Sequence, residues 1–217
     1  MNDKRFVVYE NLTIFFKLNN LETYPPSEDS FLLANHVKRF VKNKKVLDLG
    51  CGSGIQGLVA KKYGASEITF SDIDENAIII SKYNYLYNFV NKNIDLNNIK
   101  NIKTDVNFIK SDLFSSIKEK YDVIIFNPPY LPKIDKEDEN VSKWITGGKE
   151  GCELIIKFLN QAINHINKNS IILLVYSSLS KPEKIEKYAK NLGFNIEILD
   201  EERFFFEKLY IVMLSIK

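Results

Sequence analysis

Short apolar segments alternate with helix-like segments along most of this chain, and that alternation restricts the fold more than any other feature. The pattern predicts strands near 46–49, 67–72, 104–110, 123–126 and 171–176, and helices near 54–63, 75–88, 150–167 and 181–192. The last two strands, about 194–200 and 207–216, leave no room for a helix between them and should form an antiparallel hairpin. Such a chain folds as an α/β protein with a mostly parallel sheet covered on both faces.

The segment before this alternation has its own character. Residues 6–18 are rich in aromatic and β-branched side chains and predict a short strand pair, which Tyr24-Pro25-Pro26 ends. Ser27 is placed to begin a helix that continues to about residue 42. Residues 89–103 and 131–148 are polar and predict loops. We therefore expect a single domain over residues 1–217, with the strand pair in 1–23 and the α/β core in 24–217.

Composition excludes several classes of protein. The chain has 30 Lys and Arg residues and 28 Asp and Glu residues, which gives a net charge of +2. This composition is too balanced to indicate by itself a protein that binds nucleic acid over a basic surface. Two cysteines, Cys51 and Cys152, have no metal-like spacing, which argues against a disulfide scaffold or a metal site. No signal peptide is recognisable, and no apolar run approaches the ~20 residues of a membrane span. We expect a cytoplasmic protein without a metal and without a membrane partner.

A glycine-rich turn follows the first strand of the core and predicts a ligand site. Gly50, Gly52 and Gly54 allow positive φ and close approach of a ligand to the backbone. The spacing differs from that of a dinucleotide site, in which the third glycine comes one position later. Asp48, just before the turn, would repel a pyrophosphate but attract the ammonium of a methionine moiety. The turn therefore indicates S-adenosylmethionine (SAM).

Acidic residues at the ends of the next two strands fit the same cofactor. Asp72 lies at the roughly 20-residue distance from the turn at which a ribose-binding carboxylate is expected. Asp74 is the alternative, but its side chain should point elsewhere. Ile73 and Leu113 would support the adenine, and the Asp112 carboxylate could accept a hydrogen bond from the adenine amino group.

The reactive site is expected directly after the strand at 123–126. The segment Asn127-Pro128-Pro129-Tyr130 contains two prolines, which stiffen the backbone and remove two donors. The Asn127 side-chain carbonyl and the Pro128 backbone carbonyl remain as acceptors for the two hydrogens of a planar NH₂ group. Tyr130 offers a flat face on which that group can stack. The arrangement predicts methylation of an amide or amino nitrogen, with Asn127, Pro128 and Tyr130 as catalytic residues.

Together these residues resemble class I methyltransferases, whose fold is a Rossmann-like seven-stranded sheet. More closely, the chain resembles the HemK family, the protein-(glutamine-N5) methyltransferases that act on peptide chain release factors. The likeness is to the short branch of archaea and eukaryotes, which lacks the helical N-terminal domain of bacterial members. It covers roughly residues 24–160 and rests on four segments: Tyr24–Leu33, Asp48–Gly54, Phe126–Tyr130 and Trp144–Gly151. One departure is Pro25-Pro26, where that branch usually has Glu-Pro.

The resemblance implies more than the residues do by themselves. The implied cofactor contacts are Ser30, Asp48, Gly50, Asp72, Asp112 and Asn127, and the implied binding residues for the substrate glutamine are Asn127, Pro128, Pro129 and Tyr130. The substrate would be the Gly-Gly-Gln loop of a release factor, and the loop 144–148 would shape its entrance. The branch commonly works with a small zinc-binding activator protein, which here would pair with the edge strand 104–110. The product would be S-adenosylhomocysteine.

Other readings use the same motifs. An adenine-N6 methyltransferase acting on DNA or RNA would flip its base onto Tyr130, but the near-neutral charge and the lack of an added recognition domain count against it. A protein lysine methyltransferase is a further alternative. A non-catalytic cofactor-binding scaffold does not explain why Asn127 and Tyr130 are present together. A nicotinamide dehydrogenase disagrees with the glycine spacing.

Overall fold

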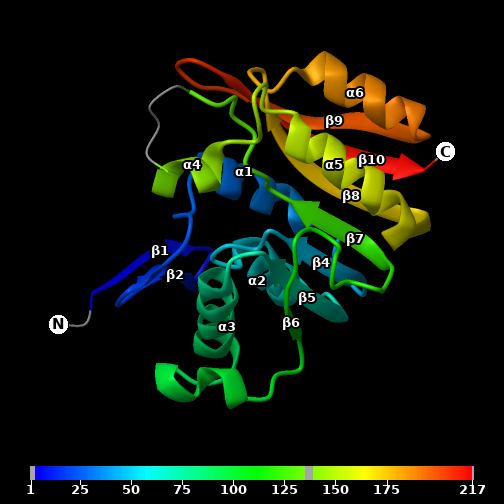
Figure 1. Cartoon of the computed structure of the whole chain (residues 1–217). Coiled ribbons are helices and arrows are strands. Elements are labelled where there is room, and N and C mark those ends of the chain that lie inside the picture. Colours follow the sequence, from blue (N-terminus) through cyan, green and yellow to red (C-terminus); the bar gives the residue numbers. More distant parts are fainter. Residues whose placement is uncertain (1–2, 135–138, 217) are drawn as a thin grey trace. The chain divides into compact units, whose positions relative to one another are not determined.

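The structure is a computed structural model that describes residues 3–134 and 139–216. The chain divides into two compact units, 1–117 and 118–217, and each is described here by itself (Figure 1). The single domain expected over residues 1–217 stays a prediction. Among the described residues, no helix combines the length and the apolar character needed to cross a membrane.

The first unit combines a small antiparallel sheet with the first half of the α/β pattern. Its elements are β1 (Lys4–Tyr9), β2 (Leu12–Leu18), β3 (Leu21–Glu22), α1 (Glu28–Val37), β4 (Lys45–Leu49), α2 (Ile55–Lys62), β5 (Glu67–Asp72), α3 (Glu75–Phe89), the 3₁₀ helix η1 (Leu96–Asn101) and β6 (Asn107–Lys110). Strands β1, β2 and β3 pair antiparallel. Strands β4, β5 and β6 pair in parallel in the order β6-β5-β4, so their carboxyl ends share one edge.

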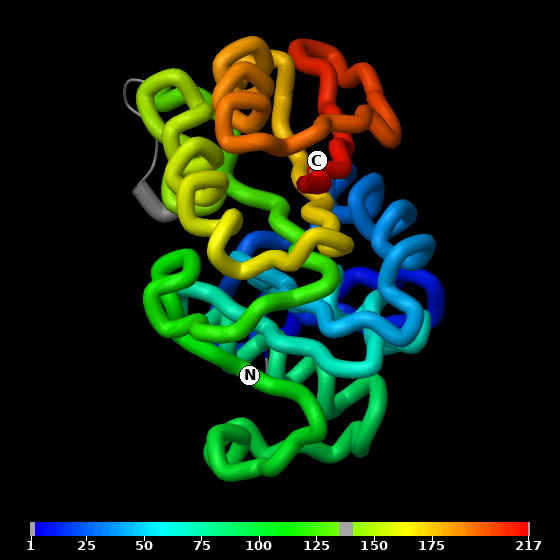
Figure 2. Tube along the Cα trace, turned by 90° about the vertical axis from the view of Figure 1, so that its right-hand side faces the viewer, coloured from blue at the N-terminus to red at the C-terminus, as the bar shows by residue number. Residues whose placement is uncertain are grey.

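The second unit completes the α/β pattern. Its elements are β7 (Tyr121–Phe126), α4 (Glu139–Ile145), α5 (Glu153–Ala162), the 3₁₀ helix η2 (Ile163–His165), β8 (Ile166–Ser177), α6 (Pro182–Asn191), β9 (Phe194–Arg203) and β10 (Lys208–Ile216). The strand order is β7-β8-β10-β9, in which β7 and β8 are parallel while β10 is antiparallel to β8 and to β9. The expected C-terminal hairpin is therefore confirmed. Helices α5 and α6 lie side by side in both views (Figures 1 and 2).

Seven strands form the large sheet, three from the first unit and four from the second, which confirms the mostly parallel α/β class with an antiparallel end. Its strands carry continuous apolar runs because both faces are covered. Val46 and Leu47 in β4, and Ile124 and Ile125 in β7, have no exposed surface. On α5, Phe158 packs its ring 4.6 Å from that of Phe126 at the end of β7.

The N-terminal strands pack on α3, and two asparagines of that helix complete the hydrogen bonding of β2. The Asn84 side chain accepts from the Phe15 amide (2.9 Å) and donates to the Phe15 carbonyl (2.7 Å). Asn88 does the same for Thr13, at 2.9 and 2.8 Å. One carboxamide presents a donor and an acceptor in one plane, as a neighbouring strand would. The helix therefore satisfies a strand edge that would otherwise leave polar backbone groups buried and unpaired.

Several expected boundaries are wrong. The segment 131–148 is not a loop throughout, because it contains α4, whose Trp144 and Ile145 are partly buried; residues 135–138 lie outside the described part. The strand expected at 104–110 covers only Asn107–Lys110, since the Thr104 hydroxyl donates to the Val106 carbonyl (2.8 Å) and turns the chain before it. The polar segment 89–103 contains η1, which Asp95 caps through the Asn97 amide (2.9 Å).

Helix lengths also differ from expectation. The first helix ends at Val37 rather than near residue 42, and the helix expected at 150–167 consists of α5 followed by η2, with β8 starting at Ile166. Ser27 occupies the N-cap position as expected, although its side chain makes no capping hydrogen bond to the helix backbone.

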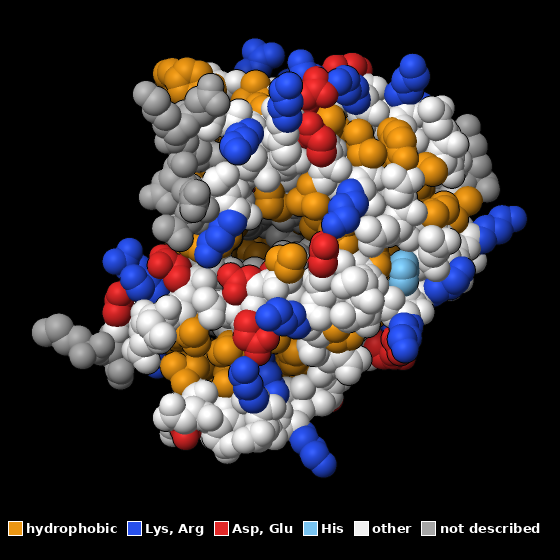
Figure 3. All heavy atoms as spheres, in the orientation of Figure 1, with side chains coloured by type: hydrophobic (Ala, Val, Ile, Leu, Met, Phe, Trp, Pro, Cys, Tyr) orange, Lys and Arg blue, Asp and Glu red, His pale blue; other side chains and the backbone are white. Residues whose placement is uncertain are grey.

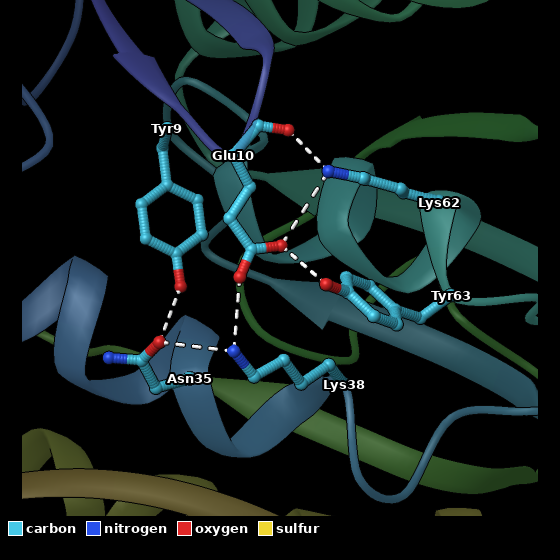
Figure 4. A network of polar contacts seen from close by, with 6 residues as sticks. All are labelled: Tyr9, Glu10, Asn35, Lys38, Lys62 and Tyr63. Carbon is cyan, nitrogen blue, oxygen red and sulfur yellow. Dashed lines mark hydrogen bonds and ion pairs between the residues drawn. The ribbon is translucent and has the colours of Figure 1, made fainter.

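The turn between β1 and β2 is fastened to α1 and α2 by a polar network centred on Glu10 (Figure 4). The Glu10 carboxylate accepts from the Lys38 ammonium (3.0 Å) and from the Tyr63 hydroxyl (2.6 Å), and it pairs with Lys62 (3.6 Å). Tyr9 donates from the same turn to the Asn35 side chain (2.8 Å). The hydrogen bond from Tyr63 and the lysines beside it lower the pKa of Glu10. The network gives the strand pair β1–β2 a structural role in the first unit.

Replacing Glu10 with Gln should lower stability in a pH-dependent way. The folded-state pKa of Glu10 is lowered. Its contribution to the free energy of unfolding is therefore fully present above the unfolded-state pKa of about 4.3, and it is lost as the pH falls through the folded-state pKa. At pH 7 we expect a loss of about 0.5–1 kcal/mol relative to the wild type, since the site is partly exposed. Urea unfolding from pH 7 to pH 3 measures the difference.

The control is Glu67→Gln, which removes a single ion pair to Lys45 (3.2 Å) at an exposed position and should change little. A difference between wild type and Glu10→Gln that stays constant over this pH range would contradict the electrostatic account.

Candidate active site

The corner between β4 and α2 has the conformation that the glycines predict. Gly50, Gly52 and Gly54 have φ values of 61°, 52° and 83°, in the left-handed region that side chains with a Cβ rarely adopt. The Cys51 amide donates to the Ser71 carbonyl (2.9 Å), so the turn continues the pairing of β4 with β5. The corner is a backbone surface at the carboxyl end of the parallel strands.

Asp48 lies within β4 beneath this corner and is almost fully buried, at 2% exposure. Its carboxylate accepts from the Gly57 amide (2.8 Å), one of the free N–H groups in the first turn of α2. Burial raises the pKa of Asp48, with a smaller contribution from the negative charge of Asp72, while the Gly57 bond opposes the shift. Asp48 thus fixes the start of α2 from the end of the strand, a role that the sequence did not indicate.

Asp72 connects two loops at the same edge. One oxygen accepts from the Gly52 amide (2.9 Å) in the glycine corner, and the other accepts from the Asp74 amide (2.9 Å) after β5. Burial raises the pKa of Asp72, and the two backbone donors oppose that rise. Asp74 itself caps α3 through the Asn76 amide (2.9 Å), in line with the expectation that its side chain points elsewhere.

The loop after β6 joins this edge through Ser111. Its amide donates to the Asp72 carbonyl (2.8 Å), and its hydroxyl donates to the Leu113 carbonyl (2.8 Å). Leu113 is buried with a positive φ of 48°, whereas Ile73, after β5, is 64% exposed. Asp112 lies between these loops with an exposed side chain. The adenine contacts expected at Ile73, Asp112 and Leu113 therefore lie on the two loops that follow β5 and β6, which the Ser111 amide joins.

Ser30 lies on α1 and is linked to the glycine corner by a side chain of α2. The Gln56 side chain, two residues after Gly54, donates to the Ser30 carbonyl (2.9 Å), and the Ser30 hydroxyl donates to Asp29 (3.1 Å). The other polar atom of the Gln56 side chain, Oε1, is buried and accepts no hydrogen bond within the described part of the chain. The analysis of motifs did not single out Gln56, because its only signal is its position directly after the glycine turn.

Asn84 is a second residue that the motifs did not reveal. Besides its bonds to Phe15, its side chain donates to the Ser53 carbonyl (2.8 Å) in the glycine corner, and it has no exposed surface. One buried carboxamide thus joins the N-terminal strands, α3 and the corner. The available signal was the pair Asn84 and Asn88, four residues apart in an otherwise apolar and aromatic helix.

In the second unit, the segment Asn127–Tyr130 follows β7 directly. Its end is fixed by the Ser180 hydroxyl, which donates to the Tyr130 carbonyl (2.7 Å). The next residue, Leu131, donates to the Ile145 carbonyl (2.8 Å) and accepts from the Gly147 amide (2.9 Å). The segment 145–151 therefore runs beside the Asn-Pro-Pro-Tyr segment as a partner strand would.

Two glycines make this approach possible. A Cβ on Gly147 would lie 2.5 Å from the Pro129 carbonyl oxygen and 2.5 Å from the Gly151 carbonyl oxygen. A Cβ on Gly151, whose φ is +83°, would lie 2.4 Å from the Tyr130 carbonyl oxygen. All three distances are shorter than a van der Waals contact allows. The loop 144–148, expected to shape the substrate entrance, thus belongs to a longer segment, 144–151, that fixes the backbone of the Asn-Pro-Pro-Tyr segment.

The structure therefore places, at or next to the carboxyl ends of β4, β5 and β6, most of the residues expected to hold the cofactor: Asp48, Gly50, Gly52, Asp72, Ile73, Asp112 and Leu113. Ser30 lies on α1 and is linked to this region by Gln56. The residues expected to hold the substrate belong to the second unit, at the carboxyl end of β7.

Comparisons with known proteins agree with these features. Residues 28–198 match the family described as the methyltransferase small domain. A Methanocaldococcus jannaschii protein, provisionally named a protein N5-glutamine methyltransferase, is 35% identical over 195 residues, which are 88% of this chain and 90% of that protein. The release factor glutamine methyltransferase of Borreliella burgdorferi is 32% identical over 86% of this chain, which spans 63% of that longer relative.

A solved structure shares the fold. The Mtq2–Trm112 complex of E. cuniculi, described as responsible for methylation of the translation termination factor eRF1, superposes with a TM-score of 0.67. The match covers 89% of this chain and 98% of that one at 23% sequence identity.

Fold and sequence together define a class I methyltransferase that uses S-adenosylmethionine. The chain belongs to the methyltransferase small domain family, and its relatives include protein-glutamine methyltransferases.

Asn84→Ala should weaken both the fold and cofactor binding. It leaves the Ser53 carbonyl and both polar backbone groups of Phe15 without their buried partner, which should cost about 2–4 kcal/mol of unfolding free energy. Because the glycine corner loses a support, affinity for SAM should fall about tenfold, or about 1.4 kcal/mol. Chemical denaturation and calorimetric titration with SAM measure the two effects.

Asn88→Ala is the matched control, since Asn88 bonds Thr13 on the same strand but does not bond the corner. It should destabilise the chain while leaving SAM affinity unchanged. An equal loss of affinity in both variants would show that Asn84 acts through general stability alone.

Gly147→Ala should slow methyl transfer at least tenfold while sparing SAM affinity. The added methyl group displaces the Pro129 carbonyl, and misplacement of a positioning group by a fraction of an ångström is costly to the rate. Single-turnover transfer from labelled SAM gives the rate, and calorimetry gives the affinity.

Gly193→Ala serves as the control for this variant. Gly193 has a φ of +90° and no atom within 4 Å of an added Cβ, so alanine there strains the backbone by about 1 kcal/mol without touching the segment 127–131. The Gly147 account is wrong if both variants lose the same fraction of activity.

Proposed function

We propose that this enzyme transfers the methyl group of SAM to the side-chain amide nitrogen of a glutamine in the Gly-Gly-Gln loop of a peptide chain release factor. The observation that carries the proposal is the rigid Asn127–Tyr130 segment, fixed by Ser180 and by close packing against Gly147 and Gly151. The names of the relatives from M. jannaschii and B. burgdorferi support the same substrate class.

The proposed chemistry depends on holding a weak nucleophile. An amide nitrogen shares its lone pair with its carbonyl, so it attacks a methyl group slowly. The Asn127 side-chain oxygen and the Pro128 carbonyl would accept the two N–H groups, and Tyr130 would stack on the amide plane. This directs the nitrogen lone pair at the methyl carbon. Positioning of this kind can supply up to about 7–11 kcal/mol of barrier lowering.

The bond changes balance without a strong base. The new N–C bond would form as the S–C bond of SAM breaks, and the bonding electron pair would stay on the sulfur of the leaving S-adenosylhomocysteine. The methylated nitrogen carries a positive charge and three substituents besides its acyl carbon, so it is acidic and loses one proton to water. Asn127 and Pro128 are acceptors of hydrogen bonds in this scheme, not proton acceptors.

The first unit offers groups that fit each part of SAM. When bound, SAM supplies a methyl group on an electrophilic sulfonium. We assign the ribose hydroxyls to Asp72, the adenine face to Ile73 and Leu113, and the adenine amino group to Asp112. The methionine part would lie along Gly50 and Gly52, with Ser30 and Asn127 as further contacts. The negative charge of Asp48 beneath the corner would attract the ammonium group of the methionine part of SAM.

A partner and a location complete the proposal. We propose that a small zinc-binding activator protein pairs with β6, which ends the strand order and has two half-buried apolar side chains, Phe108 and Ile109. The E. cuniculi neighbour was solved as a complex with Trm112. Release factors work at the ribosome, so we place the enzyme in the cytoplasm.

The test is methylation with labelled SAM of a release factor, of its Gly-Gly-Gln variant with Gln→Ala, and of duplex DNA and RNA in separate reactions. Label on the factor that disappears in its Gln→Ala variant supports the proposal. Label that persists at a lysine would identify a protein lysine as the substrate instead. Label that appears on nucleic acid alone would identify a nucleic acid as the substrate.

Variants of the enzyme separate the proposed roles in the same assay. Asn127→Ala should reduce turnover at least a thousandfold with SAM affinity nearly unchanged. Asp72→Asn should instead raise the Kd for SAM about 10- to 100-fold, since it loses a charged acceptor. Full turnover in Asn127→Ala would disprove the assigned role of that residue.

A further inference from the structure

The tip of the hairpin β9–β10 carries the most exposed large apolar side chains among the described residues. Phe205 is 95% exposed and Phe206 is 86% exposed. Their rings lie 5.2 Å apart at 62°, so they form one apolar knuckle, which Figure 3 shows as hydrophobic surface over the tip of this hairpin at the upper left. Exposed apolar surface of this kind is uncommon on a monomer without a binding role.

The turn that carries the knuckle is well bonded. The Phe204 amide donates to the Glu207 carbonyl (2.8 Å), which closes the turn around Phe205 and Phe206. Below it, the Lys208 ammonium pairs with Glu201 (3.1 Å) across the two strands. The two rings are therefore presented on a fixed support.

The knuckle lies at the catalytic edge of the second unit. In the sheet register, Leu209 at the start of β10 is opposite Ser177 at the end of β8, and β8 runs parallel to β7. The tip of the hairpin therefore lies at the carboxyl ends of β7 and β8, where Asn127–Tyr130 leaves the sheet. Figure 1 shows the tip on the same side of these strands as α4.

A short chain of hydrogen bonds links the base of the hairpin to Tyr130. The Ser178 amide donates to the Lys208 carbonyl (2.8 Å), and the Lys208 amide donates to the Ser178 hydroxyl (3.0 Å). In the same turn, the Ser180 amide donates to the Ser177 carbonyl (3.0 Å) and the Ser180 hydroxyl to the Tyr130 carbonyl (2.7 Å). The distance between the knuckle and the reactive segment is thus fixed by the serine turn 177–180.

The charges around the knuckle indicate what kind of molecule fits it. Residues 200–208 contain four acidic side chains and two basic ones: Asp200, Glu201, Glu202, Glu207, Arg203 and Lys208. A net negative rim repels a nucleic-acid backbone. It suits a protein with an apolar pocket bordered by basic side chains.

We propose that Phe205 and Phe206 anchor the protein substrate of this methyltransferase at a site separate from the Asn-Pro-Pro-Tyr segment. The proposal rests on the proposed function, because the occupant is the release factor itself. The knuckle binds a surface of the factor outside its Gly-Gly-Gln loop, and the serine turn sets the spacing at which the loop reaches Tyr130.

The test compares the wild type with the double variant Phe205→Ser and Phe206→Ser, on the intact release factor and on a short peptide that contains the Gly-Gly-Gln sequence. Both side chains are exposed, so thermal unfolding should be unchanged. With the intact factor, KM should rise at least tenfold while kcat stays the same. With the peptide, both constants should equal those of the wild type.

The double variant Val8→Ser and Val90→Ser is the control, since both valines are 63% exposed and lie in the first unit. It should keep wild-type kinetics on both substrates. An unchanged KM for the intact factor in the phenylalanine variant would overturn the knuckle proposal while the proposed function stands. A wild-type enzyme that labels no release factor would overturn the proposed function and the occupant together.

Two other outcomes would also overturn the proposal. If the KM for nucleic acid rises in the phenylalanine variant, the molecule that binds the knuckle is a nucleic acid. A change from dimer to monomer in sedimentation, with KM unchanged, would make the knuckle a contact between copies of this chain.

Discussion

Side chains that take up otherwise unpaired backbone groups hold the glycine corner, the part of the chain where we propose that SAM binds. Asp48 accepts the Gly57 amide, Asp72 accepts the Gly52 amide, and Asn84 donates to the Ser53 carbonyl. A buried backbone group left without a partner costs about 1–3 kcal/mol, so each bond selects one conformation of a glycine-rich segment that could adopt many. Because these three side chains come from β4, β5 and α3, the corner takes shape only when the sheet and the helix are assembled.

In the second unit, close packing fixes the Asn127–Tyr130 segment, which we propose to be the reactive one. Pro128 and Pro129 limit the backbone angles, but they do not determine where the segment lies. That is decided by Gly147 and Gly151, which let the segment 145–151 approach within distances that any side chain would prevent, and by the Ser180 hydroxyl on the Tyr130 carbonyl. Packing against the Asn-Pro-Pro-Tyr segment therefore explains why residues 147 and 151 are glycines.

The raised pKa values in the first unit have the same structural origin. Burial raises the pKa of Asp48 and of Asp72, and both carboxyl groups accept backbone hydrogen bonds that hold the corner. Such shifts often mark acid–base catalysts, but here each carboxyl group has a structural partner. This agrees with a reaction that depends on positioning an amide and needs no strong base.

The sequence by itself determined the α/β class, the antiparallel end of the sheet and the segments to which we assign the chemistry, because strand alternation, glycine spacing and two adjacent prolines act over a few residues. It did not reveal Gln56, Asn84 or the knuckle at Phe205 and Phe206, and it gave a loop where α4 lies and a strand longer than β6. Those features were decided by the tertiary structure. Which backbone groups a carboxamide bonds depends on the segments that the fold places beside it. Whether an aromatic ring is covered or exposed depends in the same way on neighbours from distant parts of the chain.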